Sequence, residues 1–197
     1  EIIGKYIIKD CSAIISITNK EKKQFIERNI PVSKIFNIPN GIDFNSNESK
    51  QLYSPNNFNF KKNKPYILFV GRLNFIKGPD LLLKAFISIA EKIPNYNLIF
   101  AGSDDGMEKE LKNEAKNSKF AERIHFIGFI SGSDKDNLYK NADLLVIPSR
   151  SEAMSLVVLE AGLYGLETIF TDQCGLNELS KRELGKSVKV DSNEISN

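Results

Sequence analysis

Two carboxylates, Glu152 and Glu160, flank the expected start of a helix that follows an apolar strand at residues 143–148. Backbone N–H groups in the first turn of a helix have no intrahelical acceptor and carry a positive partial charge, so they attract phosphate. The carboxylates lie eight residues apart, one before the helix and one about a turn and a half into it. They can therefore reach either side of a bound phosphate, where their natural partners are hydroxyl groups.

Two cations follow an earlier apolar strand: Gly71 allows the chain to turn tightly, and Arg72 and Lys77 come after it. A planar guanidinium fork and a compact ammonium are the usual partners of a diphosphate. The alternative is a tight turn with two surface cations. Together with the helix start near Leu156 and Val157, these cations supply roughly +2.5 charges, against about two negative charges on a nucleoside diphosphate sugar. A metal is then unnecessary.

Other chemical motifs are absent from the sequence or have a simpler explanation. The sequence contains no Walker loop and no G-x-G-x-x-G, which argues against an ATPase site and a dinucleotide site. Asp104 and Asp105 could suggest a metal, but aspartate at a helix start is usually a cap. We interpret these two residues as capping side chains.

The elements that must position these residues alternate regularly from residue 66 onward. Continuously apolar strands that alternate with helices predict a parallel sheet covered on both faces, a doubly wound, Rossmann-like α/β domain. Such a domain binds ligands beyond the carboxyl ends of its strands. The expected strands are residues 66–70, 98–101, 123–127, 144–147 and 168–170, and the expected helices are 80–92, 107–117, 135–140 and 155–164.

The segment before this domain has a different pattern. We expect short strands at residues 13–17 and 35–38, with a helix between them that Asn19 caps. Residues 45–64 are rich in Asn, Ser and Lys and show no period, which is typical of a linker.

Composition excludes several classes of protein. In a chain of 197 residues, 41% are hydrophobic, 26% are charged and the net charge is +2, which gives no basis for nucleic-acid binding. Cys11 and Cys174 have no metal-ligand spacing around them, and we expect reduced thiols and a cytoplasmic location. No apolar run is long enough to span a bilayer, and there is no signal-peptide pattern. The first residue is Glu1 and not Met, so we expect a fragment.

Several segments together resemble the retaining, nucleotide-sugar-dependent glycosyltransferases of the group 1 family, which have the GT-B fold. They occur in the order and spacing of that family over nearly the whole chain. The segments are Ile38-Pro-Asn-Gly-Ile-Asp43, Phe69-Val-Gly-Arg-Leu73 with Lys77-Gly78, Ala101-Gly102, His125-Phe-Ile-Gly-Phe129, and residues 149–172 with Glu152 and Glu160.

The resemblance implies a role for each matching residue. By this comparison, Glu152 contacts hydroxyls of the donor sugar and Glu160 holds the ribose hydroxyls. Arg72 and Lys77, next to Gly71, neutralise the diphosphate and stabilise the leaving nucleotide. Glu152, Arg72 and Lys77 are thus the expected catalytic residues. The backbone of Ser155, Leu156 and Val157 lies over the phosphates, and Gly128 and Phe129 lie near the base.

The sequence also departs from the family pattern. Where the family commonly has Gly, an aromatic residue and Gly after the first glutamate, this chain has Ala153, Met154 and Ser155. These side chains narrow the sugar pocket, so the identity of the sugar stays open. Glu167 replaces a common Pro, which should cost rigidity more than chemistry.

The resemblance implies three regions. Residues 1–44 are a remnant of the N-terminal, acceptor-side domain, residues 45–64 are the linker, and residues 65–197 are the C-terminal nucleotide-sugar-binding domain, truncated at its end. The acceptor domain is expected to be missing, so the chain alone should bind donor but not transfer sugar. Membrane contact, at the cytoplasmic face, would be made by the absent domain.

The resulting expectation is the donor-binding part of a retaining, metal-independent glycosyltransferase of polysaccharide or related biosynthesis. It would use a UDP- or GDP-sugar, need no metal or other cofactor, and transfer the sugar to a hydroxyl of a glycan, lipid or protein-linked acceptor. The alternatives are a GT-B sugar-nucleotide epimerase or phosphorylase, and a non-catalytic nucleotide-sugar-binding subunit that works with a separate acceptor-binding protein.

Overall fold

The computed structural model of the chain describes residues 8, 10–42, 65–176 and 185–197. It divides into two compact units, Glu1–Ile42 and Asp43–Asn197, and each is described by itself. The predicted linker, residues 45–64, lies outside the described residues, so the predicted domain boundaries stay a prediction. None of the described helices combines the length and the apolar character that a membrane crossing requires.

The first unit contains a small parallel sheet and one helix. Strand β1 (Ile14–Ser16) pairs with β2 (Ile35–Asn37), and helix α2 (Asn19–Glu27) connects them through a short 3-10 turn, η1 (Val32–Lys34). The predicted cap Asn19 is wrong by one residue. Thr18 is the N-cap, and its side chain accepts a hydrogen bond from the Glu21 N–H at 3.2 Å.

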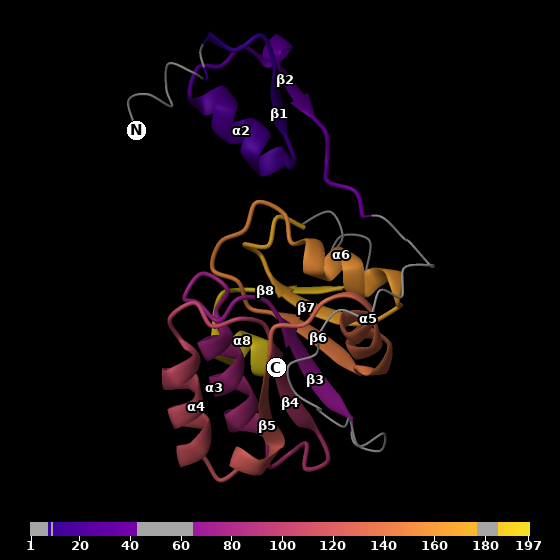
Figure 1. Cartoon of the computed structure of the whole chain (residues 1–197). Coiled ribbons are helices and arrows are strands. Elements are labelled where there is room, and N and C mark those ends of the chain that lie inside the picture. The colour runs from indigo at the N-terminus through magenta and orange to yellow at the C-terminus, as the bar shows by residue number, and fades with distance from the viewer. Residues whose placement is uncertain (1–7, 9, 43–64, 177–184) are drawn as a thin grey trace. The chain divides into compact units, whose positions relative to one another are not determined.

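The second unit is built on a six-stranded sheet in which every pair of neighbouring strands is parallel. Within the described residues, four longer helices and a short terminal helix flank it (Figure 1). In sheet order, the strands are β5 (Ile124–Gly128), β4 (Asn97–Ala101), β3 (Tyr66–Val70), β6 (Leu144–Ile147), β7 (Thr168–Thr171) and β8 (Lys186–Val188). The helices are α3 (Pro79–Ile89), α4 (Glu108–Asn117), α5 (Gly132–Asn141), α6 (Leu156–Leu163) and α8 (Ser192–Ser196), with a 3-10 turn η2 (Ala121–Arg123) before β5.

Alternate residues of each strand face two separate cores. In β3, Leu68 packs with α5 and α6, whereas Ile67 and Phe69 pack with α3, α4 and α8 on the opposite face of the sheet (Figure 1). Both faces are therefore buried, which explains why the central strands β3 and β6 are apolar at every position. The prediction of a doubly wound α/β domain is confirmed.

The strand order creates a topological switch point between the neighbouring strands β3 and β6, at their carboxyl ends. The chain adds β4 and β5 on one side of β3, and then crosses to add β6, β7 and β8 on the other side. The connections after β3 and β6 therefore diverge at the carboxyl ends of two neighbouring strands, which is where doubly wound sheets bind ligands. These connections are the β3–α3 loop (residues 71–78) and the β6–α6 loop (residues 148–155), and they contain the predicted cations and Glu152.

Candidate functional site

The β3–α3 loop begins beside the β4–α4 loop (residues 102–107). The Leu73 side chain is buried, its N–H donates to the Ser103 carbonyl at 2.9 Å, and its carbonyl accepts from the Asp105 N–H at 3.2 Å. Leu73 and Asp104 form a parallel bridge. The backbone pairing of β3 and β4 thus continues into the two loops and fixes the backbone at Arg72.

Glycine is required at different positions from the one that the sequence suggested. Gly71, predicted to form the tight turn, does not have a positive φ. The steric demand falls on Gly102, where a Cβ atom would lie 1.8 Å from the Gly71 carbonyl oxygen, and on Gly78, where it would lie 2.2 Å from the Pro148 carbonyl oxygen. Gly78 also has a φ of +67°, in the left-handed region. These contacts bring the β3–α3 loop against its neighbours on both sides.

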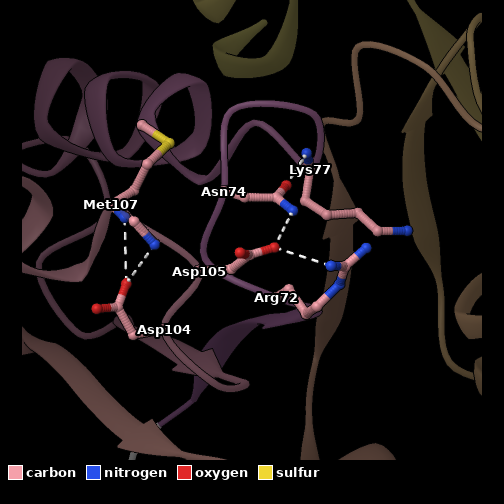
Figure 2. Close-up of polar contacts among 7 residues, drawn as sticks. Arg72, Asn74, Lys77, Asp104, Asp105 and Met107 are labelled. Atoms are coloured by element: carbon pink, nitrogen blue, oxygen red, sulfur yellow. Dashed lines mark hydrogen bonds and ion pairs between the residues drawn. The ribbon is translucent and has the colours of Figure 1, made fainter.

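Arg72 is held by a carboxylate from the β4–α4 loop (Figure 2). Its Nη1 lies 2.8 Å from Asp105 Oδ2, and the same oxygen accepts a hydrogen bond from Asn74 Nδ2 at 2.7 Å. The Asn74 side-chain oxygen in turn accepts the backbone N–H of Lys77 at 2.9 Å. Asp105 therefore anchors both Arg72 and the turn that leads to Lys77.

Asp104 and Asp105, which the sequence suggested as caps, have different roles. Asp104 Oδ1 accepts the N–H groups of Gly106, Met107 and Glu108 at 3.0 to 3.1 Å, two of which Figure 2 draws. These bonds, led by that from Glu108, hold the pKa of Asp104 below its usual range. Asp104 thus accepts N–H groups at the start of α4, as expected of a capping side chain, although the N-cap position itself is Met107. The Asp105 side chain binds Arg72 and Asn74 instead.

Lys77 and Glu152 meet where the loops after β3 and β6 diverge. Lys77 Nζ lies 3.1 Å from Glu152 Oε2, and only 9% of the Glu152 side chain is exposed. The Ser149 hydroxyl donates to the other oxygen, Glu152 Oε1. The Glu152 N–H donates to the Gln173 carbonyl at 2.9 Å, which fixes the backbone. One predicted cation and one predicted carboxylate thus share one site.

The β6–α6 loop rests on a buried polar cluster below Glu152. The Thr171 hydroxyl donates to the Ser149 carbonyl, and the Cys174 thiol lies 3.5 Å from the Ile147 carbonyl oxygen. Burial outweighs the opposing hydrogen bond with Thr171 and raises the pKa of the Cys174 thiol to about 11, so the thiol stays neutral. Both cysteines are free thiols, as predicted.

The N-terminus of α6 differs in one respect from its predicted role. The Ser155 N–H donates to the Cys174 carbonyl at 3.0 Å, so it is already used within the fold. The Ser155 hydroxyl is buried and has no hydrogen-bond partner among the described residues. Leu156 and Val157 begin the helix, and their N–H groups have no acceptor within it. These two residues supply the donors of this helix start.

Glu160 is held by two side chains of α5 that sequence reasoning missed. Lys135 Nζ lies 3.0 Å from Glu160 Oε1, and the Tyr139 hydroxyl donates to Oε2 at 2.8 Å. Burial, together with the Glu160 carboxylate, raises the pKa of Tyr139. Both oxygens of Glu160 thus have fixed donors, which orients the carboxylate before any ligand arrives.

Gly128 and Phe129 lie at the end of β5, at the same edge of the sheet. Gly128 has a φ of +75°, and its carbonyl accepts the Gly102 N–H at 2.8 Å. The Phe129 side chain is 59% exposed. An exposed aromatic ring at this edge provides a flat apolar surface, although β5 is two strands from β3.

The family of the chain follows from its sequence. The family described as "Glycosyl transferases group 1" matches residues 53–194. The chain belongs to this family. The match includes both loops, all the predicted site residues and the whole six-stranded sheet.

Individual members of this group 1 family are similar to the chain over most of its 197 residues. An uncharacterised glycosyltransferase of Methanocaldococcus jannaschii is 34% identical over 161 residues, which are 79% of this chain and 41% of that protein. Mannosylfructose-phosphate synthase of Agrobacterium fabrum is 29% identical over 183 residues, 86% of this chain and 40% of that protein. The chain thus spans less than half the length of these two relatives.

A solved structure has the same fold. The crystal structure of Anabaena HepE in complex with UDP-glucose matches with a TM-score of 0.79 and 22% identity, over 99% of this chain and 55% of that one. At this identity the likeness concerns the fold, and it agrees with the predicted membership of the GT-B class. The roles of the individual site residues stay predictions.

Proposed function

We propose that this chain is the nucleotide-sugar-binding part of a retaining, metal-independent glycosyltransferase that uses a UDP- or GDP-sugar. The observation that carries the proposal is the 3.1 Å contact between Lys77 Nζ and Glu152 Oε2 at the carboxyl ends of β3 and β6. A cation and a carboxylate in one site match a ligand in which phosphate is joined to a hydroxyl-bearing sugar. Family membership and the UDP-glucose complex of HepE support the same ligand class.

In this proposal each group of the site has one task. Lys77 and Arg72 neutralise the diphosphate, and they stabilise the charge that develops on it as the sugar leaves. Glu152 accepts hydrogen bonds from sugar hydroxyls, and the N–H groups of Leu156 and Val157 face a phosphate. Glu160, which lies further along α6, accepts hydrogen bonds from the ribose. The sugar is transferred to a hydroxyl of a glycan, lipid or protein-linked acceptor.

Calorimetric titration of the purified chain with UDP, GDP and ADP tests this proposal. We expect micromolar to millimolar affinity for one of them, and the same affinity after a chelator is added, because the cations and the helix start carry the charge. A strict requirement for Mg²⁺ would contradict metal independence. Failure of the chain to bind any of the three nucleotides would contradict a donor site complete within these residues.

Asp105 provides a second test, because it places a negative charge beside the proposed diphosphate site. Asp105→Asn should tighten binding of the preferred nucleoside diphosphate by about two- to threefold at low ionic strength. The gain should shrink at high salt, because Arg72 and Asp105 are both exposed. Glu110→Gln, at an exposed position of α4, removes the same charge as a control. Weaker binding in Asp105→Asn would show instead that Asp105 prearranges Arg72.

A further inference from the structure

Arg150 lies in the β6–α6 loop, two residues before Glu152, and its main chain already joins the two loops of the site. The Arg150 N–H donates to the Ile76 carbonyl at 2.7 Å, and Ile76 directly precedes Lys77. This backbone hydrogen bond therefore joins the residue before Lys77 to the segment that leads to Glu152.

The guanidinium of Arg150 adds three hydrogen bonds, two to the start of α3 and one to the β3–α3 loop. It forms a bidentate pair with Asp80 in the first turn of α3, with Nη–Oδ distances of 2.8 and 2.7 Å. Nη1 also donates to the Phe75 carbonyl at 2.7 Å, and the group lies 4.0 Å from the centre of the Phe75 ring. A lysine could not reproduce this fork, because it has no planar pair of donors.

The Arg150–Asp80 pair is largely shielded from water, and both side chains are charged. The two side chains are 20% and 16% exposed. Burial alone would raise the pKa of Asp80, but the hydrogen bonds and charge of Arg150 outweigh it and hold that pKa below its usual range. Bidentate pairs of this kind fix geometry as well as adding energy.

Apolar burial does not fix this part of the β3–α3 loop. Phe75 is 65% exposed and Ile76 is 51% exposed, so neither side chain anchors the segment in a core. The Asn74 side chain secures the Lys77 N–H from one side, and Arg150 secures Phe75 and Ile76 from the other. Segments with few buried contacts depend on such polar bonds for their order.

We propose that Arg150 is a positioning residue that sets the spacing between Lys77 and Glu152 by fastening the β3–α3 loop to the β6–α6 loop. This inference rests on the proposed function, in which Lys77 binds the diphosphate and Glu152 binds the sugar. Arg150 itself touches no ligand. It acts by keeping the ammonium of Lys77 where the phosphates of the donor must lie.

The test uses the full 197-residue chain with Arg150→Lys and Asp80→Asn, titrated with UDP and UDP-glucose and, in parallel, with GDP and GDP-mannose. Each variant should lose about tenfold in affinity for the probes that the parent binds, the size of one charge-assisted hydrogen bond. The double variant should lose little more than either single variant, because both break one contact.

A matched control separates positioning from general stability. Arg123 also donates to two carbonyls, of Ile93 and Ala90 at 2.9 and 2.8 Å, and lies over the rings of Phe86 and Phe120, but it precedes β5 at the opposite edge of the sheet. Arg123→Lys should lower the melting temperature at least as much as Arg150→Lys and leave the affinities unchanged.

Coupling to Lys77 is the decisive readout. If Arg150 acts through Lys77, then Lys77→Gln should weaken binding less in the Arg150→Lys background than in the parent chain. Fully additive losses, or an Arg150→Lys affinity equal to that of the parent, would overturn the positioning role alone. A parent chain that binds none of the four probes would overturn the proposed function, and this inference with it.

Discussion

Replacement of Glu160 by glutamine or alanine is expected to weaken binding of the preferred nucleotide by about 1.5 to 3 kcal/mol, because it removes charge-assisted hydrogen bonds to the ribose. The structure strengthens this expectation, because Lys135 and Tyr139 already hold the carboxylate in one orientation. A prearranged acceptor loses little conformational entropy when the ligand binds. Titration of the Glu160→Gln chain against the parent measures the effect.

The same contacts require a control, because Glu160 also satisfies a buried hydroxyl. Tyr139 is 1% exposed, so Glu160→Ala, which removes its acceptor, should itself cost about 1 to 3 kcal/mol of folding free energy, whereas Glu160→Gln keeps an oxygen that can accept. Tyr139→Phe removes this hydrogen bond and leaves the carboxylate in place. It should keep most of the nucleotide affinity, whereas Glu160→Gln should not. Equal affinities in Glu160→Gln and the parent would exclude the ribose role.

The positions of the strands along the chain were the part of the fold that the sequence predicted best. Strands β3 and β6 have the predicted bounds, because each is an unbroken apolar run that ends at a turn residue. Helix ends were less accurate. Helix α3 begins at Pro79, one residue before the prediction, because Gly78 in the left-handed region precedes it, and it ends at Ile89 rather than residue 92.

The last two elements of the sheet domain were not predicted. Strand β8 is three residues long and only Val188 in it is buried, so it has no apolar run to detect. Helix α8 is five residues long, but Asp191 accepts the N–H groups of Asn193 and Glu194. That capping pattern was a usable signal. Ile195 joins the core that contains Phe86, so the segment completes one face of the sheet.

The candidate site divides in the same way. Sequence spacing pointed to Lys77 and Glu152 as candidate site residues, because the signals that end a strand and start a helix are local and lie in consecutive residues. The residues that hold the candidate side chains and their loops were not assigned these contacts: Asp105 binds Arg72, Tyr139 binds Glu160, and Arg150 binds Phe75 and Asp80. Their partners are 21 to 75 residues away in the sequence, so only the strand order brings them together. Local patterns thus indicate candidate binding groups, and the strand order decides how these groups are oriented.

Lys77→Met is expected to destabilise the fold by about 2 to 3 kcal/mol, because it leaves the nearly buried Glu152 carboxylate without its cation. The Glu152 side chain is 9% exposed and the Lys77 side chain is 26% exposed. The two partners are therefore not equivalent. Glu152→Gln should cost no more than about 1 kcal/mol, since the longer Lys77 side chain can turn to water. Urea unfolding of both variants measures the difference.

The double variant Lys77→Met with Glu152→Gln decides whether burial is the cause. Without the carboxylate there is no unpaired charge, so the double variant should be more stable than Lys77→Met alone, and the two losses should not add. Ser149 still donates to the remaining side-chain oxygen at position 152. Equal losses in the two single variants, or additive losses in the double variant, would show that the pair behaves as an exposed one. Nucleotide affinity should fall in the Lys77→Met chain even where it is fully folded, because the proposed diphosphate cation is gone.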